Sequence, residues 1–96
     1  MAEIPAQTPT VAAGVEVTVR YFAAARAAAG TEMETLSVRT GTTVAELVKQ
    51  LADRGTQLAT VLSRCSYLRD GIAVRDEASA LSAGDTIDVL PPFAGG

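Results

Sequence analysis

Residues 15–22 read Val15-Glu16-Val17-Thr18-Val19-Arg20-Tyr21-Phe22, and apolar and polar side chains alternate along them. Branched residues on one parity are typical of a β-strand that buries one face. We therefore expect Val17, Val19 and Tyr21 to point into a core. Phe22 breaks the alternation, and its parity places it on the outer face of the strand.

A short helix and a second strand follow this first strand. Residues 23–29 are rich in alanine and are followed by Gly30, a pattern that predicts a short helix with a glycine cap at its end. Residues 33–39 predict a second strand, with Leu36 and Val38 as its buried pair.

The clearest helix signal begins at Thr43. Thr43 and Glu46 have the spacing of a capping box, in which each side chain accepts a backbone amide of the other residue. Four apolar residues then share one helical face: Val44, Leu47, Val48 and Leu51. We expect this helix to end at Gly55, and a shorter helix to occupy residues 57–65.

The remaining elements are a hairpin and a last strand. Asp70-Gly71 separates two short apolar runs, which predicts a tight hairpin. Residues 86–90 predict a strand with Ile87 and Val89 inward, and Pro91-Pro92 ends it because proline has no amide donor. This order predicts an α+β fold with helices packed on one face of a mixed sheet.

The 96 residues fit one domain, which we place at residues 15–90. Residues 1–14 predict a flexible leader, and residues 91–96 an extended C-terminal tail. The leader has neither the cationic start of a signal peptide nor a membrane span, so we expect a cytoplasmic protein. The net charge is -3 and the basic residues are scattered, which argues against nucleic acid and membranes as partners.

The body of the chain lacks the usual catalytic residues. It contains no histidine, and its single cysteine, Cys65, has neither an evident base nor a second cysteine with which to bind a metal. We expect Cys65 to be a small buried apolar residue. We accordingly expect no metal site and no bound cofactor on this chain.

Chemistry is more plausible at the C-terminal tail, Leu90-Pro91-Pro92-Phe93-Ala94-Gly95-Gly96. A terminal glycine pair arises by chance in roughly one protein in two hundred. Six extended residues reach up to about 20 Å, and glycines pass through channels too narrow for side chains. The carboxylate of Gly96 is a poor electrophile, so a partner has to activate it, for example by ATP-dependent adenylation.

The tail resembles the Pro-Pro-x-x-Gly-Gly ending of molybdopterin synthase small subunits, which are ubiquitin-like sulfur carriers. Tyr21-Phe22-Ala23 followed by Arg26, and Ala83-Gly84-Asp85 before the last strand, are also similar to this family. Thiazole-synthesis sulfur carriers of the same family usually lack the proline pair. One departure is Leu68-Arg69-Asp70-Gly71, which stands where many members carry a Val-Asn pair.

This resemblance implies a β-grasp, ubiquitin-like fold and a non-catalytic sulfur-donor subunit that is inactive alone. It implies that an E1-like enzyme adenylates Gly96 with ATP and converts it to a thiocarboxylate. The tail, from Pro91, Pro92, Phe93 and Ala94 to Gly95, then inserts into the large subunit of a heterotetrameric synthase. There the sulfur passes to a cyclic pyranopterin phosphate, in molybdenum cofactor biosynthesis.

Three alternatives stay open at the level of sequence: a sulfur carrier for thiazole or cysteine synthesis, a ubiquitin-like modifier joined through Gly96 to lysines, and an interaction domain with an inert tail. Phe22 and Leu90 are candidates for docking to a partner or for packing at the edge of the core. Phe93 lies beyond the last strand, and we expect it to contact the partner.

Overall fold

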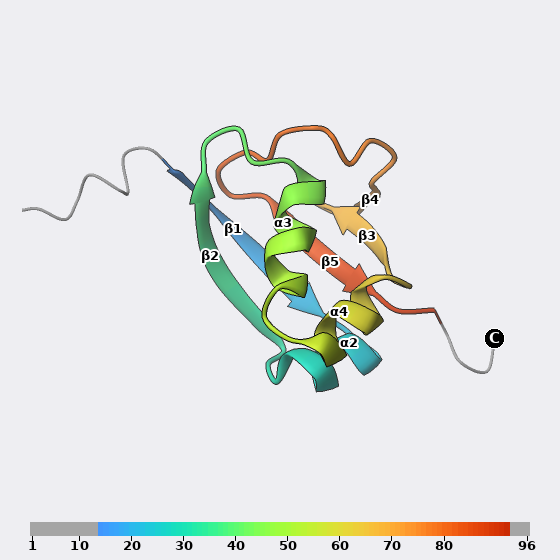
Figure 1. The fold of residues 1–96 in the computed structure, drawn as a ribbon. Helices are drawn as coiled ribbons and strands as arrows, with labels where there is room; N and C mark the ends of the chain where they lie inside the picture. Colours follow the sequence, from blue (N-terminus) through green and yellow to red (C-terminus); the bar gives the residue numbers. More distant parts are fainter. Residues whose placement is uncertain (1–13, 93–96) are drawn as a thin grey trace, which may run out of the picture.

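Five strands in the described residues, 14–92, form one mixed sheet in this computed structural model (Figure 1). From edge to edge they are β2 (Met33–Arg39), β1 (Gly14–Tyr21), β5 (Thr86–Leu90), β3 (Ser66–Arg69) and β4 (Ile72–Ala73). The central strands β1 and β5 are parallel, and the other neighbours are antiparallel. The strand β1 begins at Gly14, one residue before the predicted start, because Gly14 already pairs with Arg39.

Three helices cover one face of this sheet, as Figure 1 shows: α2 (Ala23–Ala29), α3 (Val44–Ala52) and α4 (Thr56–Leu62). The helices α2 and α4 pack against each other near the end of the sheet where β5 finishes, and α3 also contacts α4. No helix of residues 14–92 lies on the opposite face of the sheet. The predicted α+β architecture, with helices on one face of a mixed sheet, is therefore confirmed.

The core lies between the sheet and the helices. The predicted inward residues of β1 and β5, including Val19, Ile87 and Val89, are fully buried, and Val38 of β2 is buried as well. Leu36 is only half-buried and packs at the margin of the core. The helices contribute four buried leucines: Leu47, Leu51, Leu58 and Leu62. Val48 of α3 is likewise half-buried, so alternation and helical spacing predicted the centre of the core but not its margin.

Both predicted helices of residues 43–65 exist, with different ends. The hydroxyl of Thr43 accepts the amide of Glu46 at 3.1 Å, and the Glu46 carboxylate accepts the amide of Thr43 at 2.9 Å, so the capping box is confirmed. The helix α3 ends at Ala52 rather than at Gly55, because the chain turns over residues 53–55 and Gly55 instead precedes α4.

The hairpin between β3 and β4 turns at Asp70 and Gly71, which have φ values of 51° and 84°. Two positive φ values are typical of the tight turn that an Asp-Gly pair predicts. The Asp70 carboxylate also accepts the amide of Thr86 at 2.9 Å. This bond fixes the hairpin to the start of β5, the strand that leads into the tail.

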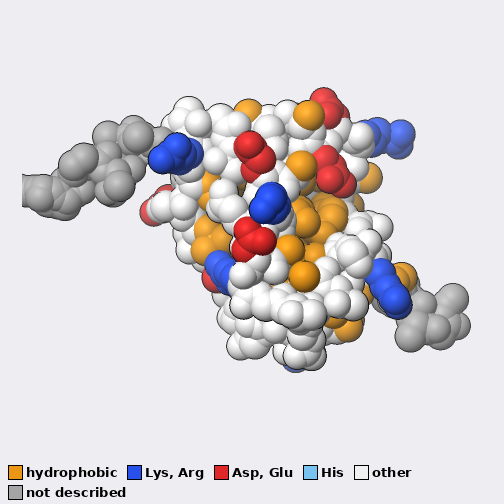
Figure 2. All heavy atoms as spheres, in the orientation of Figure 1, with side chains coloured by type: hydrophobic (Ala, Val, Ile, Leu, Met, Phe, Trp, Pro, Cys, Tyr) orange, Lys and Arg blue, Asp and Glu red, His pale blue; other side chains and the backbone are white. Residues whose placement is uncertain are grey.

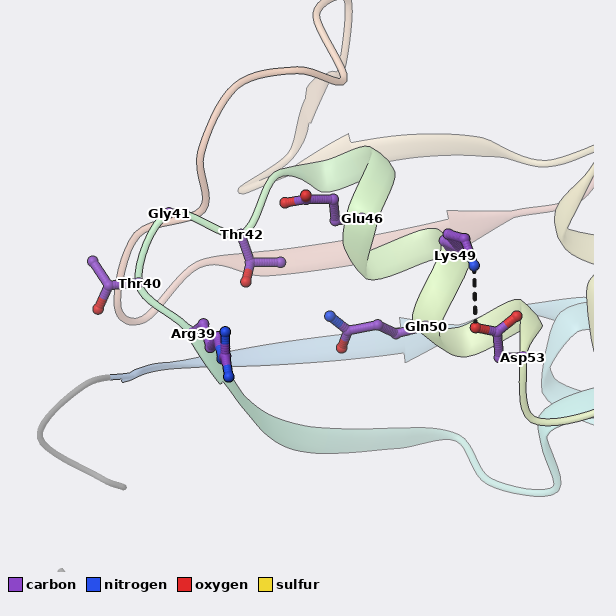
Figure 3. Close-up of a pocket in the computed structure, with 8 residues that line it drawn as sticks. All are labelled: Arg39, Thr40, Gly41, Thr42, Glu46, Lys49, Gln50 and Asp53. Atoms are coloured by element: carbon purple, nitrogen blue, oxygen red, sulfur yellow. Dashed lines mark hydrogen bonds and ion pairs between the residues drawn. The ribbon is translucent and has the colours of Figure 1, made fainter. Parts of the chain in front are cut away.

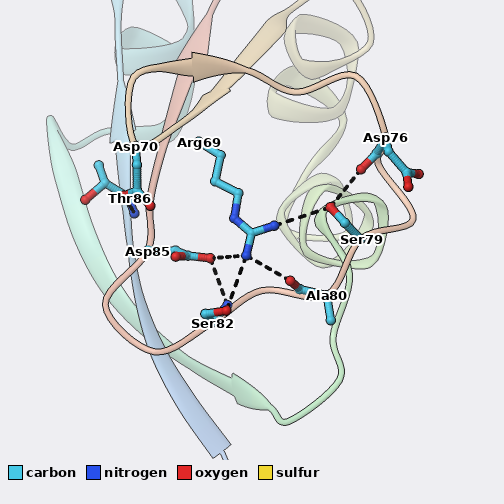
Figure 4. A network of polar contacts seen from close by, with 8 residues as sticks. All are labelled: Arg69, Asp70, Asp76, Ser79, Ala80, Ser82, Asp85 and Thr86. Carbon is cyan, nitrogen blue, oxygen red and sulfur yellow. Dashed lines mark hydrogen bonds and ion pairs between the residues drawn. The ribbon is translucent and has the colours of Figure 1, made fainter.

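A polar network centred on Arg69 holds the long loop between β4 and β5 (Figure 4). The guanidinium of Arg69 lies 2.7 Å from the carboxylate of Asp85 and donates to the carbonyl oxygen of Ala80 at 2.9 Å. The Asp85 carboxylate is nearly buried and also accepts the amide of Ser82 at 2.8 Å. Arg69, which lies in the segment that departs from the family pattern, therefore has a structural role in this loop.

Candidate functional site

The predicted reactive tail leaves the molecule from the middle of the sheet. The strand β5 lies between β1 and β3 and ends at Leu90; Pro91 is half-buried and Pro92 is exposed. The amide of Phe22 donates to the carbonyl oxygen of Val89 at 3.2 Å, which ties the end of β1 to this point. The root of the tail is therefore fixed on both sides.

The remaining tail residues lie outside the described part of the chain: Phe93, Ala94, Gly95 and Gly96. Their roles in insertion and in sulfur chemistry stay predictions. The predicted leader, apart from Gly14, lies outside the described part as well.

Strand pairing gathers apolar side chains on the open face of the sheet. Arg20 of β1 pairs with Met33 of β2 on one side and with Asp88 of β5 on the other, and Asp88 in turn pairs with Leu68 of β3. Paired residues project from the same face, so these side chains form a row across the sheet. Together with two residues nearer the tail they form what we call the open-face patch: Arg20, Phe22, Met33, Leu68, Asp88 and Leu90.

Phe22 and Leu90, the predicted docking residues, both lie at the root of the tail. Phe22 is 38% exposed, and Leu90 is half-buried at the end of β5. Phe22 shares the outer face with Arg20, as its parity predicted, because the guanidinium carbon of Arg20 lies 5.5 Å from the centre of the Phe22 ring. Both residues therefore lie at the root of the tail on the open face, and their role in docking stays a prediction.

An ion pair that the sequence did not reveal occupies the centre of the patch. Arg20 Nε and Nη2 lie 2.6 Å and 2.8 Å from the two carboxylate oxygens of Asp88. The Asp88 side chain is only 7% exposed, whereas that of Arg20 is 47% exposed. The hydrogen bond from Arg20, followed by the charge of Asp88, raises the pKa of the Arg20 guanidinium above its usual value. Alternation placed both residues outward, but only the parallel pairing of β1 and β5 brings them together.

A second network lies between the sheet and the turn after α3. The hydroxyl of the buried Tyr21 donates to Glu34 Oε2 at 2.6 Å, and Arg54 donates to the same oxygen at 2.7 Å. Burial favours a raised pKa for Glu34, but the hydrogen bonds from Arg54 and Tyr21 and the charge of Arg54 outweigh it and lower that pKa. The network therefore links β1, β2 and the helices, and it has the character of a structural clamp.

Cys65 follows α4 and packs half-buried against the core. Its Sγ donates to the carbonyl oxygen of Val61 at 3.2 Å, and burial raises the pKa of the thiol. A thiol that stays protonated is a weak nucleophile. Cys65 is thus less buried than expected, although its packing role is as predicted.

One surface groove of the described residues runs beside α3. The groove in Figure 3 has a volume of about 450 Å³ and is open to solvent, and its walls carry Arg39, Glu46 and the exposed pair Lys49 and Asp53. Figure 2 shows that acidic and basic side chains are interspersed on the helix-covered face. Within residues 14–92 no three His, Cys, Asp or Glu side chains gather as metal ligands would, and no helix is long and apolar enough to span a membrane.

These features define the class of protein. A mixed sheet with two parallel central strands and a helix packed across one face is the β-grasp fold of ubiquitin-like proteins. The ubiquitin of Caldiarchaeum subterraneum shares this fold, with a TM-score of 0.59 and 12% identity over 86% of this chain and 99% of that one.

Within this class, the model of the ThiS family matches residues 19–96, and the chain belongs to that family. It is 29% identical to the molybdopterin synthase sulfur carrier subunit of Chlamydomonas reinhardtii, over 85% of this chain and all of that protein. It is similar to the solution structure of a Haloferax volcanii protein, HVO 2177, with 30% identity and a TM-score of 0.77 over 88% of this chain and 89% of that one. It is also similar to the solution structure of small archaeal modifier protein 1 of Methanosarcina acetivorans, with 29% identity and a TM-score of 0.72 over 86% of this chain and 98% of that one.

Proposed function

We propose that this chain is the sulfur carrier subunit of a molybdopterin synthase and delivers sulfur as a thiocarboxylate on Gly96. The observation that carries the proposal is the position of the tail root. The tail leaves the central strand directly beside the open-face patch, so a protein docked on Phe22 and Leu90 meets the start of the tail. Membership of the ThiS family and likeness to the Chlamydomonas carrier subunit support the same function.

The chemistry requires an activating partner. In the first step a carboxylate oxygen of Gly96 attacks the α-phosphorus of ATP and pyrophosphate leaves, so the carbonyl gains a good leaving group. Sulfide supplied by a sulfur donor then attacks the acyl carbon, a C–S bond forms as the bond to AMP breaks, and a terminal thiocarboxylate remains. An E1-like enzyme binds ATP and catalyses these steps. The present chain supplies only the acyl group.

The second partner is the large subunit of the synthase, with which the chain forms a heterotetramer in the cytoplasm. The open-face patch docks on this subunit, and the tail carries the thiocarboxylate to a cyclic pyranopterin phosphate. Pro91 and Pro92 restrict the backbone at the base of the tail, which lowers the entropy lost on insertion. Phe93 and Ala94 insert with the tail, and Phe93 contacts the large subunit. Gly95 has no side chain and lets the reacting end pass through a narrow channel of that subunit.

Reconstitution tests the proposal. The chain is incubated with the E1-like enzyme, ATP and a sulfur donor, and its intact mass is expected to change by the exchange of one oxygen for sulfur. The charged chain is then mixed with the large subunit and the pterin precursor, and transfer of sulfur is expected to restore the original mass. A chain that is never charged, or that keeps its sulfur in the presence of the large subunit, contradicts the proposal.

A ubiquitin-like modifier is the second candidate, because the chain is also similar to the Methanosarcina small archaeal modifier protein. This function requires the activated Gly96 to acylate lysine amines instead of accepting sulfur. Tryptic digestion of cell extract followed by mass spectrometry distinguishes the two, since conjugation leaves residues 76–96 of this chain in isopeptide linkage on lysines of other proteins. A pull-down that recovers a thiazole or cysteine synthesis enzyme in place of the large subunit identifies a different sulfur pathway.

A further inference from the structure

We propose that Arg20 is a specificity-determining residue, which selects a partner surface with neutral oxygen acceptors facing the centre of the open-face patch. The inference rests on the function proposed above, because it concerns the docking of the large subunit. It adds to that function a residue and a required chemistry on the partner side.

Asp88 holds Arg20 in one orientation. Both carboxylate oxygens of Asp88 are used, by Nε at 2.6 Å and by Nη2 at 2.8 Å, and the guanidinium also lies over the Phe22 ring. A planar group held by two parallel bonds has little freedom to turn. Arg20 is therefore ordered before any partner arrives.

The guanidinium retains donors that Asp88 does not use. Arginine carries five N–H donors, and the two bonds to Asp88 occupy two of them. Because almost half of the Arg20 side chain is exposed while Asp88 is nearly buried, solvent satisfies the remaining donors in the free chain. A docked partner removes this solvent.

The surroundings of the pair make this removal costly unless the partner replaces the water. Apolar side chains frame the pair: Phe22, Met33, Leu68 and Leu90. A partner that covers this frame excludes water from the centre, and buried donors without acceptors disfavour binding. The matching partner surface therefore places oxygen atoms opposite Arg20.

The charge of the pair indicates which oxygens are suitable. Arg20 and Asp88 together are neutral, so backbone carbonyl or side-chain amide oxygens satisfy the free donors without adding charge. A carboxylate at this position would leave one buried negative charge in excess, which is costly in a dry interface. An apolar surface without acceptors is also rejected, and this gives the patch its selectivity.

A double variant tests the proposal. Arg20→Leu with Asp88→Leu removes the pair without leaving an orphaned buried charge, so the fold is retained. Binding of the full chain to the large subunit from the same organism is measured by calorimetry. We expect the double variant to bind about 10-fold more weakly or worse, because the acceptors of the partner lose their donors. The milder variant Arg20→Lys keeps the charge, and we expect it also to bind more weakly, because lysine cannot form the bidentate pair.

Arg75→Leu is the matched control. Arg75 is exposed in the loop that follows the edge strand β4, outside the open-face patch, and makes no ion pair within residues 14–92. Its replacement is expected to leave binding within about twofold, as surface substitutions usually do. If the double variant binds as tightly as the unaltered chain, the pair is purely structural and this inference alone is overturned. If the unaltered chain does not bind the large subunit, the proposed function and this inference fail together.

Discussion

Replacing Phe22 with alanine is expected to weaken docking of the large subunit by up to about 30-fold. A phenylalanine offers roughly 200 Å² of apolar surface, so the 38% that is exposed in the free chain leaves about 75 Å² for a partner to cover. At about 25 cal/mol per Å², covering this area contributes about 2 kcal/mol, which corresponds to the stated change in Kd. The magnitude is a ceiling, because it assumes that the partner covers the whole exposed ring.

The assay is calorimetric titration of the variant against the large subunit, with thermal unfolding as a check on the fold. The bond from the amide of residue 22 to the carbonyl oxygen of Val89 involves only backbone atoms, so alanine keeps it. The variant is therefore expected to unfold within a few degrees of the unaltered chain.

Ile72→Ala provides the matched control. Ile72 is 72% exposed, more than Phe22, but it pairs with Arg69 in the edge hairpin and so faces away from the patch. Exposed area alone therefore predicts a larger effect for Ile72, whereas the position of the tail root predicts an effect only for Phe22. Equal losses for both variants, or unchanged binding of Phe22→Ala, would refute the assignment of the docking face.

Three further predictions concern the tail and the two inner networks. Adding one residue after Gly96 is expected to abolish sulfur transfer without changing unfolding, and sulfuration by an extended chain that is not trimmed contradicts the proposed chemistry. Arg69→Met leaves Asp85 nearly buried without its cation, and urea unfolding is expected to show a loss of about 2–3 kcal/mol; a loss below about 0.5 kcal/mol shows that the network of Figure 4 is dispensable. Glu34→Gln is expected to cost about 1 kcal/mol at pH 7. The folded pKa of Glu34 lies below its unfolded value, so the stabilising charge is present above the unfolded pKa and lost as the pH falls through the folded one. The difference in free energy of unfolding between Glu34→Gln and the unaltered chain is therefore expected to vanish in acid. A difference that persists at pH 2 would contradict this account and indicate a steric cause.

Local sequence patterns were sufficient to predict the individual helices and strands. Alternation identified β1 and its buried residues, the capping box located the start of α3, and Asp70-Gly71 located the hairpin turn. Each of these signals depends on residues a few positions apart, whose preferences are set by backbone geometry and local hydrogen bonds. The helix ends were less certain, because helix termination near Gly55 depends on how the next helix packs.

The composition of the site was only partly visible in the sequence. Parity placed Phe22 outward and the proline pair marked the root of the tail, so both were found before the fold was known. Parity also pointed Asp88 toward solvent, whereas the structure buries it beneath Arg20 and the surrounding apolar side chains. No local pattern marks such a residue as buried.

The sequence by itself determined the strands, the capped helix and the glycine ending, because periodicity and turn chemistry act over short stretches of chain. Only the tertiary structure decided which side chains meet on the open face. Arg20 and Asp88 are 68 positions apart, and their contact depends on β5 entering the sheet parallel to β1 in one register. That register follows from packing Ile87 and Val89 beneath the helices, a condition that involves the whole core at once.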